Sequence, residues 1–283
     1  MAENLVKTLG SAALGVMPVA VRDFCIPDDQ ALLMDMIRRG EEPPDLLIGV
    51  GRKTHWPLAR ARMQLGSRAV LLMKPSLPAF FFDLCLVPEH DRLLWEYRVL
   101  RTQGMLGPNV QGQRDPSQGV ILLGGVSQHF SWDSMAVAET VRGIVEQAPN
   151  VDWTVCDSPR SPTELGTALQ LPGNARFVHW RDCSGDWLSQ QLSQVDQVWV
   201  SADSASMLYE AVASCALVGV IELPSSKSLR NNKLQRGIDL LLEKRRLGVV
   251  AQGRLDQQRL VRDPLQEHIR CARWILASWF NVT

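Results

Sequence analysis

Short apolar runs alternate with helix-length segments of mixed polarity along almost the whole chain. Such runs are typical of buried strands in a parallel sheet, because crossover helices cover both faces of that sheet. The pattern therefore predicts an α/β protein with two successive Rossmann-like parallel-sheet domains.

The first half is predicted to hold four strands and three helices. We place the strands at residues 19–21, 46–50, 70–73 and 84–87, and the helices at 2–9, 28–39 and 56–65. A Rossmann-like lobe normally opens with a strand, whereas this chain opens with a predicted helix. We therefore expect the first domain to lack its opening strand or to have that region rearranged.

A stretch rich in turn-forming residues, Gly104–Gly119, is the best interdomain linker. After it the pattern resumes, with strands at 120–123, 153–156, 177–179, 198–200, 218–221 and 249–250, and helices at 131–147, 186–194, 204–214, 228–243 and 264–279. The predicted domains span residues 1–110 and 118–283, and the final helix is free to return to the first domain.

Composition and charge narrow the class of protein. At 283 residues, with 46% hydrophobic and 21% charged positions, the chain suits two folded domains and not a disordered or fibrous protein. Its 30 basic side chains balance 30 acidic ones, so no global field would hold a nucleic acid. Six scattered cysteines form no metal-ligand spacing, and we expect them to be reduced and mostly buried. Without a convincing signal peptide or membrane span, the expected location is the cytoplasm, with peripheral contact to the inner membrane left open.

The segment Val198–Val212 carries the strongest candidate site. An apolar strand there runs into Asp203, Ser204 and Ser206 at a predicted helix start, where free amides and hydroxyls would cradle a phosphate. Glu210 would then accept hydrogen bonds from ribose hydroxyls. Ordinary helix capping without a ligand is the alternative.

Two further loops of the second domain follow strands. Gly124 and Gly125 would let a ligand approach the backbone closely, and Ser127 would donate a hydrogen bond to a phosphate, although a simple tight turn explains the glycine pair as well. Arg160 is placed to reach a diphosphate or a base, while capping of the next helix by Ser161 is the alternative.

In the first domain, candidate residues also follow predicted strands. Arg52, Lys53 and Thr54 would hold an anion or contact the acceptor, and His90 would serve as a general base. Surface loops often carry such residues without function. We expect His90 to be at least partly exposed.

Five ordered segments together resemble the mitochondrial-fission-protein family, which comprises a plant protein of elongated-mitochondria phenotype and bacterial relatives assigned to the glycosyltransferases. They are Gly49–Thr54, Val87–Asp91, Leu122–Val126, Ser158–Pro162 and Ala202–Ala211. The resemblance implies a glycosyltransferase-B-type fold, whose two domains face each other across a cleft, with the nucleotide held mainly by the second domain and no metal or other cofactor. In the fourth segment the family usually reads SRRTP, so only Arg160 carries over.

The leading hypothesis is a metal-independent glycosyltransferase that moves a sugar from a nucleotide-activated donor to an envelope saccharide or lipid-linked acceptor. Arg160 and the helix amides would stabilise the leaving diphosphate. A non-catalytic scaffold of the same fold, active in membrane or organelle remodelling, is the second hypothesis. A sugar-nucleotide epimerase is the third.

Overall fold

The chain forms two compact units that each contain a parallel sheet. Our computed structural model describes residues 2–13, 20–21, 35, 38–39, 42–107, 110, 112–226, 232–249, 260 and 262–281. Unit 1 comprises Met1–Gly107 with Gln266–Thr283, and unit 2 comprises Pro108–Leu265. The two parallel-sheet α/β domains predicted from the sequence are thus confirmed.

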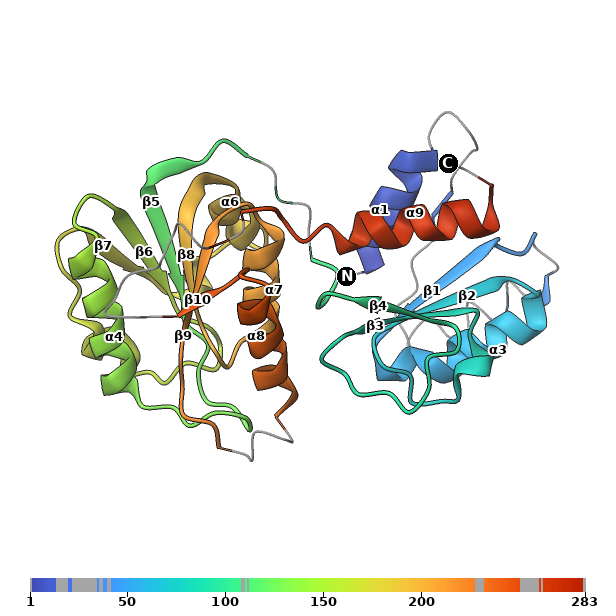
Figure 1. Ribbon diagram of the computed structural model, residues 1–283, viewed down its shortest axis with the longest axis horizontal. Helices are drawn as coiled ribbons and strands as arrows, with labels where there is room; N and C mark the ends of the chain where they lie inside the picture. Colours follow the sequence, from blue (N-terminus) through green and yellow to red (C-terminus); the bar gives the residue numbers. More distant parts are fainter. Residues whose placement is uncertain are drawn as a thin grey trace. The chain divides into compact units, whose positions relative to one another are not determined.

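Unit 1 has a four-stranded sheet in the order β1-β2-β3-β4, and every neighbouring pair is parallel. The strands are β1 (Leu46–Val50), β2 (Arg68–Leu72), β3 (Leu84–Pro88) and β4 (Val99–Thr102). Helices α1 (Ala2–Ala13) and α9 (Glu267–Trp279) lie on one face of the sheet, and α3 (His55–Leu65) lies on the other (Figure 1).

Strand alternation explains the two cores of unit 1. Successive strand residues point to opposite faces, so Val70 and Leu72 of β2 pack beneath α1 and α9, where Leu5 and Ile275 join them. The residues between and beside them face α3. That second core contains Leu58, Ala59, Ala69, Leu71, Phe82, Cys85 and Val87.

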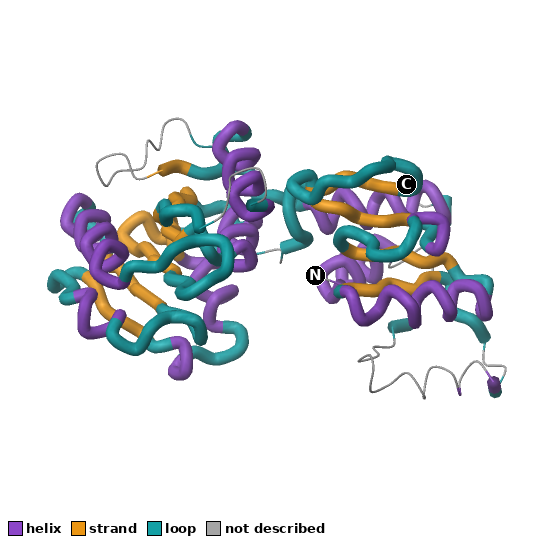
Figure 2. Tube along the Cα trace, turned by 90° about the horizontal axis from the view of Figure 1, so that it is seen from below, coloured by secondary structure: helices purple, strands orange, loops and turns teal. Residues whose placement is uncertain are grey.

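Unit 2 has a six-stranded parallel sheet in the order β10-β9-β8-β5-β6-β7 (Figures 1 and 2). The strands are β5 (Asp115–Leu122), β6 (Asp152–Cys156), β7 (Ala175–Val178), β8 (Val195–Ser201), β9 (Leu217–Ile221) and β10 (Gly248–Val249). The helices are α4 (Ser134–Gln147), α5 (Leu165–Leu169), α6 (Trp187–Gln194), α7 (Ala205–Ala213) and α8 (Lys233–Glu243). Helices α4 and α5 pack on one face of this sheet, and α7 and α8 lie on the opposite side in Figure 1.

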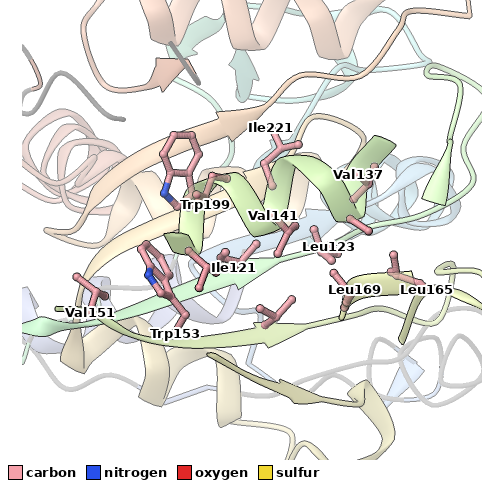
Figure 3. Packing of buried hydrophobic residues seen from close by; sticks show 14 of the residues in the cluster. Ile121, Leu123, Val137, Val141, Val151, Trp153, Leu165, Leu169, Trp199 and Ile221 are labelled. Carbon is pink, nitrogen blue, oxygen red and sulfur yellow. The ribbon is translucent and has the colours of Figure 1, made fainter. Parts of the chain in front are cut away.

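Two buried tryptophans fill the core beneath α4 (Figure 3). Trp153 of β6 lies in register with Gly119 of β5, and Trp199 of β8 with Gly219 of β9. A Cβ at Gly119 or Gly219 would lie 2.4 Å from the neighbouring indole. Each glycine therefore leaves the space that a tryptophan of the adjacent strand occupies.

The structure also differs from the predicted elements at several positions. Strand β4 was not predicted, and β5 begins at Asp115, inside the stretch taken as linker. Ala20 and Val21, the described part of the strand predicted at 19–21, belong to no strand, and most of the helix predicted at 28–39 lies outside the described residues. Helix α9 packs within unit 1, which is the return to the first domain that the sequence left open, and unit 2 ends at Leu265.

Candidate functional site

The strand order of unit 2 reverses between β5 and β8. From β5 the sheet grows through β6 to β7, whereas β8 starts a second half that grows through β9 to β10. Open α/β sheets bind ligands at such a switch point, outside the carboxyl ends of the strands. Gly124 and Gly125 follow β5 at this edge. Beside them, β8 ends at Ser201, and the chain continues through a turn to Ser204.

The carboxylate of Asp203 organises this edge. Its Oδ1 accepts a hydrogen bond from Ser201 Oγ at 2.7 Å, and its Oδ2 accepts one from Gly125 N–H at 2.9 Å. Arg160 Nη1 lies 2.9 Å from the same Oδ2, and the Asp203 side chain is 0% exposed. Asp203 was predicted as a nucleotide contact; fully buried, it instead ties together the loops that follow β5, β6 and β8.

The packing of the same junction explains why glycine occupies positions 124 and 125. A Cβ at Gly124 would lie 2.1 Å from Asp203 Oδ2, and one at Gly125 would lie 2.1 Å from the Arg160 carbonyl oxygen. The absent side chains therefore make room for Asp203 and for the loop that carries Arg160. Close approach by a ligand is not needed to explain these glycines.

Three serines that were not predicted as site residues complete the junction. Ser201 Oγ accepts the Gly124 N–H at 2.7 Å, and Ser158 Oγ donates to the Gly124 carbonyl at 2.6 Å. Ser161 Oγ also donates to that carbonyl. Ser161 therefore does not cap a helix, since α5 begins only at Leu165. The repeated hydroxyls after strand ends were the available signal, but their partners depend on which strands are neighbours.

Helix α7 begins at this junction with its first turn uncapped. Ser204 occupies the N-cap position but makes no side-chain cap hydrogen bond. The N-cap residues of α3, α5, α6 and α9 also make none, whereas α4 and α8 start with capping side chains from Asp133 and Asn232. The first amides of a helix without such a cap are available to an anion. Ser204 is buried and Ser206 is exposed in the first turn.

Glu210 lies four residues after Ser206, and positions four apart share one face of a helix. The carboxyl group is half-buried, and burial raises the pKa of Glu210 above its ordinary value. This environment penalises the charged form unless a hydrogen-bond donor is bound there.

Arg160 and Ser127 differ in their availability. The Arg160 side chain is 42% exposed although it pairs with Asp203, so further guanidinium donors remain for a phosphate. Ser127 Oγ accepts the N–H groups of His129 and Phe130 at 3.3 and 3.2 Å. Ser127 thus stabilises its own turn.

The first-domain candidates lie in unit 1, where β2 separates the two strands that they follow. Arg52 and Lys53 are exposed in a 3-10 turn, Arg52–Thr54, and Thr54 Oγ1 donates to the Gly51 carbonyl at 2.8 Å. These residues are placed to receive an anion, with Thr54 committed to the turn.

The prediction that His90 is partly exposed is wrong, because the side chain is only 7% exposed. The turn that contains it is fixed by Arg101, whose Nη1 donates to the Pro88 carbonyl at 3.1 Å and to the Asp91 carbonyl at 2.8 Å. The environment favours a structural role for His90.

A second polar pair at the edge of unit 2 escaped the sequence analysis. Asp157 Oδ1 accepts the Trp180 N–H at 2.6 Å, and His179 Nδ1 lies 3.3 Å from the same oxygen. Both residues follow neighbouring strands, β6 and β7, so their position after strand ends was the available signal.

Neither a metal-binding group nor a membrane-spanning helix occurs among the described residues. No three His, Cys, Asp or Glu side chains there are grouped so as to hold a metal ion. None of the helices in the described part of the chain combines the length and apolar composition that crossing a membrane requires.

Comparisons with solved structures found similar proteins over most of this chain. A protein assigned as a UDP-N-acetylglucosamine 2-epimerase from Listeria monocytogenes shares 15% identity over 94% of this chain and 83% of its own, with a TM-score of 0.56. MnaA of S. aureus with UDP shares 10% identity over 98% and 87%, with a TM-score of 0.48. MurG of Acinetobacter baumannii shares 14% over 90% and 76%, with a TM-score of 0.42. The first likeness shows the fold.

A search of curated proteins found no match. The family model described as mitochondrial fission ELM1 matches residues 12–279. This match extends well beyond the five segments that suggested the family and covers both units. The chain therefore belongs to the mitochondrial fission ELM1 family, with the two-domain fold of the glycosyltransferase-B type.

Proposed function

We propose that the switch-point edge of unit 2 binds a nucleotide-activated sugar and that the protein transfers this sugar to a saccharide or lipid-linked acceptor without a metal. The observation that carries the proposal is the junction of three strand-end loops around Asp203, which places Arg160 beside the uncapped start of α7. Structural rigidity alone does not require an exposed guanidinium at that place.

Each residue at this edge has a distinct role in the proposal. The first amides of α7, with the hydroxyl of Ser206, bind the diphosphate. Arg160 supplies positive charge to the leaving diphosphate as the glycosidic bond to it breaks. Glu210 accepts hydrogen bonds from the ribose, while Asp203 and Gly124 position the loops without touching the ligand.

A non-catalytic scaffold is the second candidate function, and the burial of His90 favours it. A general base must come within hydrogen-bond reach of the acceptor hydroxyl, and His90 was the base expected from the sequence. The two candidates share the nucleotide site and differ in turnover.

A two-step experiment tests the proposal. Melting temperatures are first measured with UDP, ADP, GDP and UDP-N-acetylglucosamine, since a ligand at 100 times its Kd stabilises the native state by about 2.7 kcal/mol. Release of nucleoside diphosphate from the stabilising donor is then followed with a lipid extract as acceptor. Binding with turnover supports the transferase, binding without turnover supports the scaffold, and no stabilisation by any nucleotide contradicts both.

A further inference from the structure

Unit 1 exposes a cluster of aromatic rings contributed by α3, by the 3-10 turn before β3 and by the segment before β4. We call Trp56, Phe80, Phe81 and Tyr97 the aromatic face. Trp56 is 62% exposed, Phe80 60% and Tyr97 64%. The Trp56 and Phe81 ring centres lie 6.0 Å apart and those of Phe80 and Phe81 4.4 Å apart, so these rings form one surface.

This surface is built into the fold. Within the described residues, the connections from β2 to β3 and from β3 to β4 contain no helix beyond the 3-10 turn Ala79–Phe81, so the outer side of these loops is left uncovered. Arg98 Nη1 donates to the Phe80 carbonyl at 3.3 Å and to the Phe82 carbonyl at 2.9 Å. The Arg98 guanidinium carbon also lies 5.2 Å from the centre of the Tyr97 ring, which joins Tyr97 to the same framework.

Three cationic side chains flank Trp56 of the aromatic face along the chain. Arg52, Lys53 and Arg60 are exposed, and none of them forms an ion pair with any other described residue. Arg60 follows Trp56 by one helical turn and therefore shares the outward face of α3.

The nearby acidic side chains are neutralised. Asp83 pairs with Arg62 at 2.6 Å, and Glu96 pairs with Arg101 at 3.0 Å. The chain as a whole has no net charge, so the excess of cations here is local. On a protein without net charge, a cationic and aromatic surface of this kind attracts a negatively charged partner.

We propose that the aromatic face, with Arg52, Lys53 and Arg60, binds the surface of an anionic lipid bilayer. Tryptophan and tyrosine place an apolar ring and a polar group together and suit the boundary between acyl chains and headgroups. Arginine and lysine near such a boundary gain about 1 kcal/mol each from anionic lipids. Met63, 60% exposed on the outward side of α3, adds apolar surface for acyl chains.

Single-stranded nucleic acid also binds aromatic and cationic surfaces, by stacking bases on free ring faces. Here Phe80 and Phe81 contact each other, which leaves no gap for a base between them. The bilayer therefore fits this surface better. The proposal concerns unit 1 alone and does not depend on the nucleotide site of unit 2.

Co-sedimentation of the full chain with vesicles tests the proposal. The vesicles contain phosphatidylcholine alone or phosphatidylcholine mixed with phosphatidylglycerol. We expect sedimentation with the mixed vesicles, a decrease with added salt, and at least a tenfold loss of binding in the variant W56S/F80S/Y97S. The control variant V126S/M135S, which removes two exposed apolar side chains of unit 2, should bind like the native protein.

A second variant, R52E/K53E/R60E, separates charge from apolar contact and should lose its preference for phosphatidylglycerol. Circular dichroism verifies that each variant is folded. Failure of the native protein to sediment, equal binding by the aromatic variant, or equal binding to both kinds of vesicle overturns the proposal. So does removal of the protein from vesicles by single-stranded RNA, or concentration-dependent dimerisation that the aromatic variant abolishes.

Discussion

At the scale of single residues, the candidate site depends on one buried carboxylate. Asp203 accepts hydrogen bonds or an ion pair from Ser201, Gly125 and Arg160, which belong to three different strand-end segments. The sequence identified Asp203, Arg160 and Gly125 as neighbours of strand ends, but not as partners. That pairing requires β8 to lie beside β5, and no local pattern near residue 203 specifies this neighbour.

Removing the charge of Asp203 should loosen the junction. In Asp203→Asn the ion pair to Arg160 is lost, and a buried amide cannot accept all three interactions. We expect the free energy of unfolding in urea to fall by about 1–3 kcal/mol. A double-mutant cycle with Arg160→Gln measures the coupling between the two side chains, and a coupling of zero would remove the ion pair from the account.

Glu210 should affect stability and binding in opposite directions. Burial raises the pKa of Glu210 above the ordinary value of 4.5, so the folded state disfavours the ionised carboxylate. The contribution of the protonated side chain to stability is therefore fully present below pH 4.5 and is lost as the pH rises through the raised pKa. Glu210→Gln should therefore be more stable than the native protein at pH 7 and lose this advantage near pH 4. Chemical denaturation at both pH values measures the difference.

The same variant should bind a nucleoside diphosphate more weakly, because a neutral amide accepts a hydrogen bond less strongly than a carboxylate. Unchanged affinity in a folded Glu210→Gln protein would exclude Glu210 from the site.

Thiol reactivity gives a prediction for the core of unit 1. Burial raises the pKa of Cys85 and of Cys271 to about 12 from an ordinary 9.0. Both thiols should therefore resist Ellman's reagent at pH 8 until the protein unfolds. Stability should fall as pH rises from about 9 towards 12, because the unfolded state releases these protons first. Rapid native-state labelling at either cysteine, located by mass spectrometry, would contradict this burial.

At the scale of elements, the hydrophobic pattern predicted where most strands lie in the chain, but it did not predict which strands are neighbours in a sheet. The predicted strand at 46–50 coincides with β1, because a short apolar run between turn-forming residues is typical of a buried strand. Strand β4 was missed because Val99–Thr102 is short and has only two apolar residues, followed by two polar ones. Glycine is a weak strand former, so the sequence alone gives no reason for the glycines of β5 and β9. The sheet register gives one, because it places each glycine beside a tryptophan.

Two glycine substitutions test this packing. Gly219→Ala would place a methyl group 2.4 Å from the Trp199 ring, and overpacking of this kind costs about 1–3 kcal/mol. Gly143 lies within α4 with no neighbouring atom within 4 Å of an added Cβ. Gly143→Ala should therefore stabilise the protein by about 0.5–1 kcal/mol. Equal effects of the two changes in thermal unfolding would argue against the glycine–tryptophan pairing.

At the scale of the whole molecule, two parallel sheets and the family were accessible from the sequence. The proposed location of the nucleotide site rests on a general rule, because ligands of open α/β sheets lie at strand carboxyl ends. The same rule did not identify a catalytic residue. His90 also follows the carboxyl end of a strand, but it is buried. The turn that contains His90 is fixed by Arg101 of β4, and β4 was not predicted.

The central claim is that the edge of unit 2 formed by Arg160 and the start of α7 binds a nucleoside diphosphate. Isothermal calorimetry with UDP on the native protein, Arg160→Ala and the control Arg176→Ala, a cation of β7, tests it most directly. Loss of one charge-assisted contact costs about 1.5–3 kcal/mol, so Arg160→Ala should weaken binding by roughly 10- to 100-fold while the control leaves it unchanged. Equal affinity in all three proteins, or no binding of any nucleoside diphosphate by the native protein, would contradict the account.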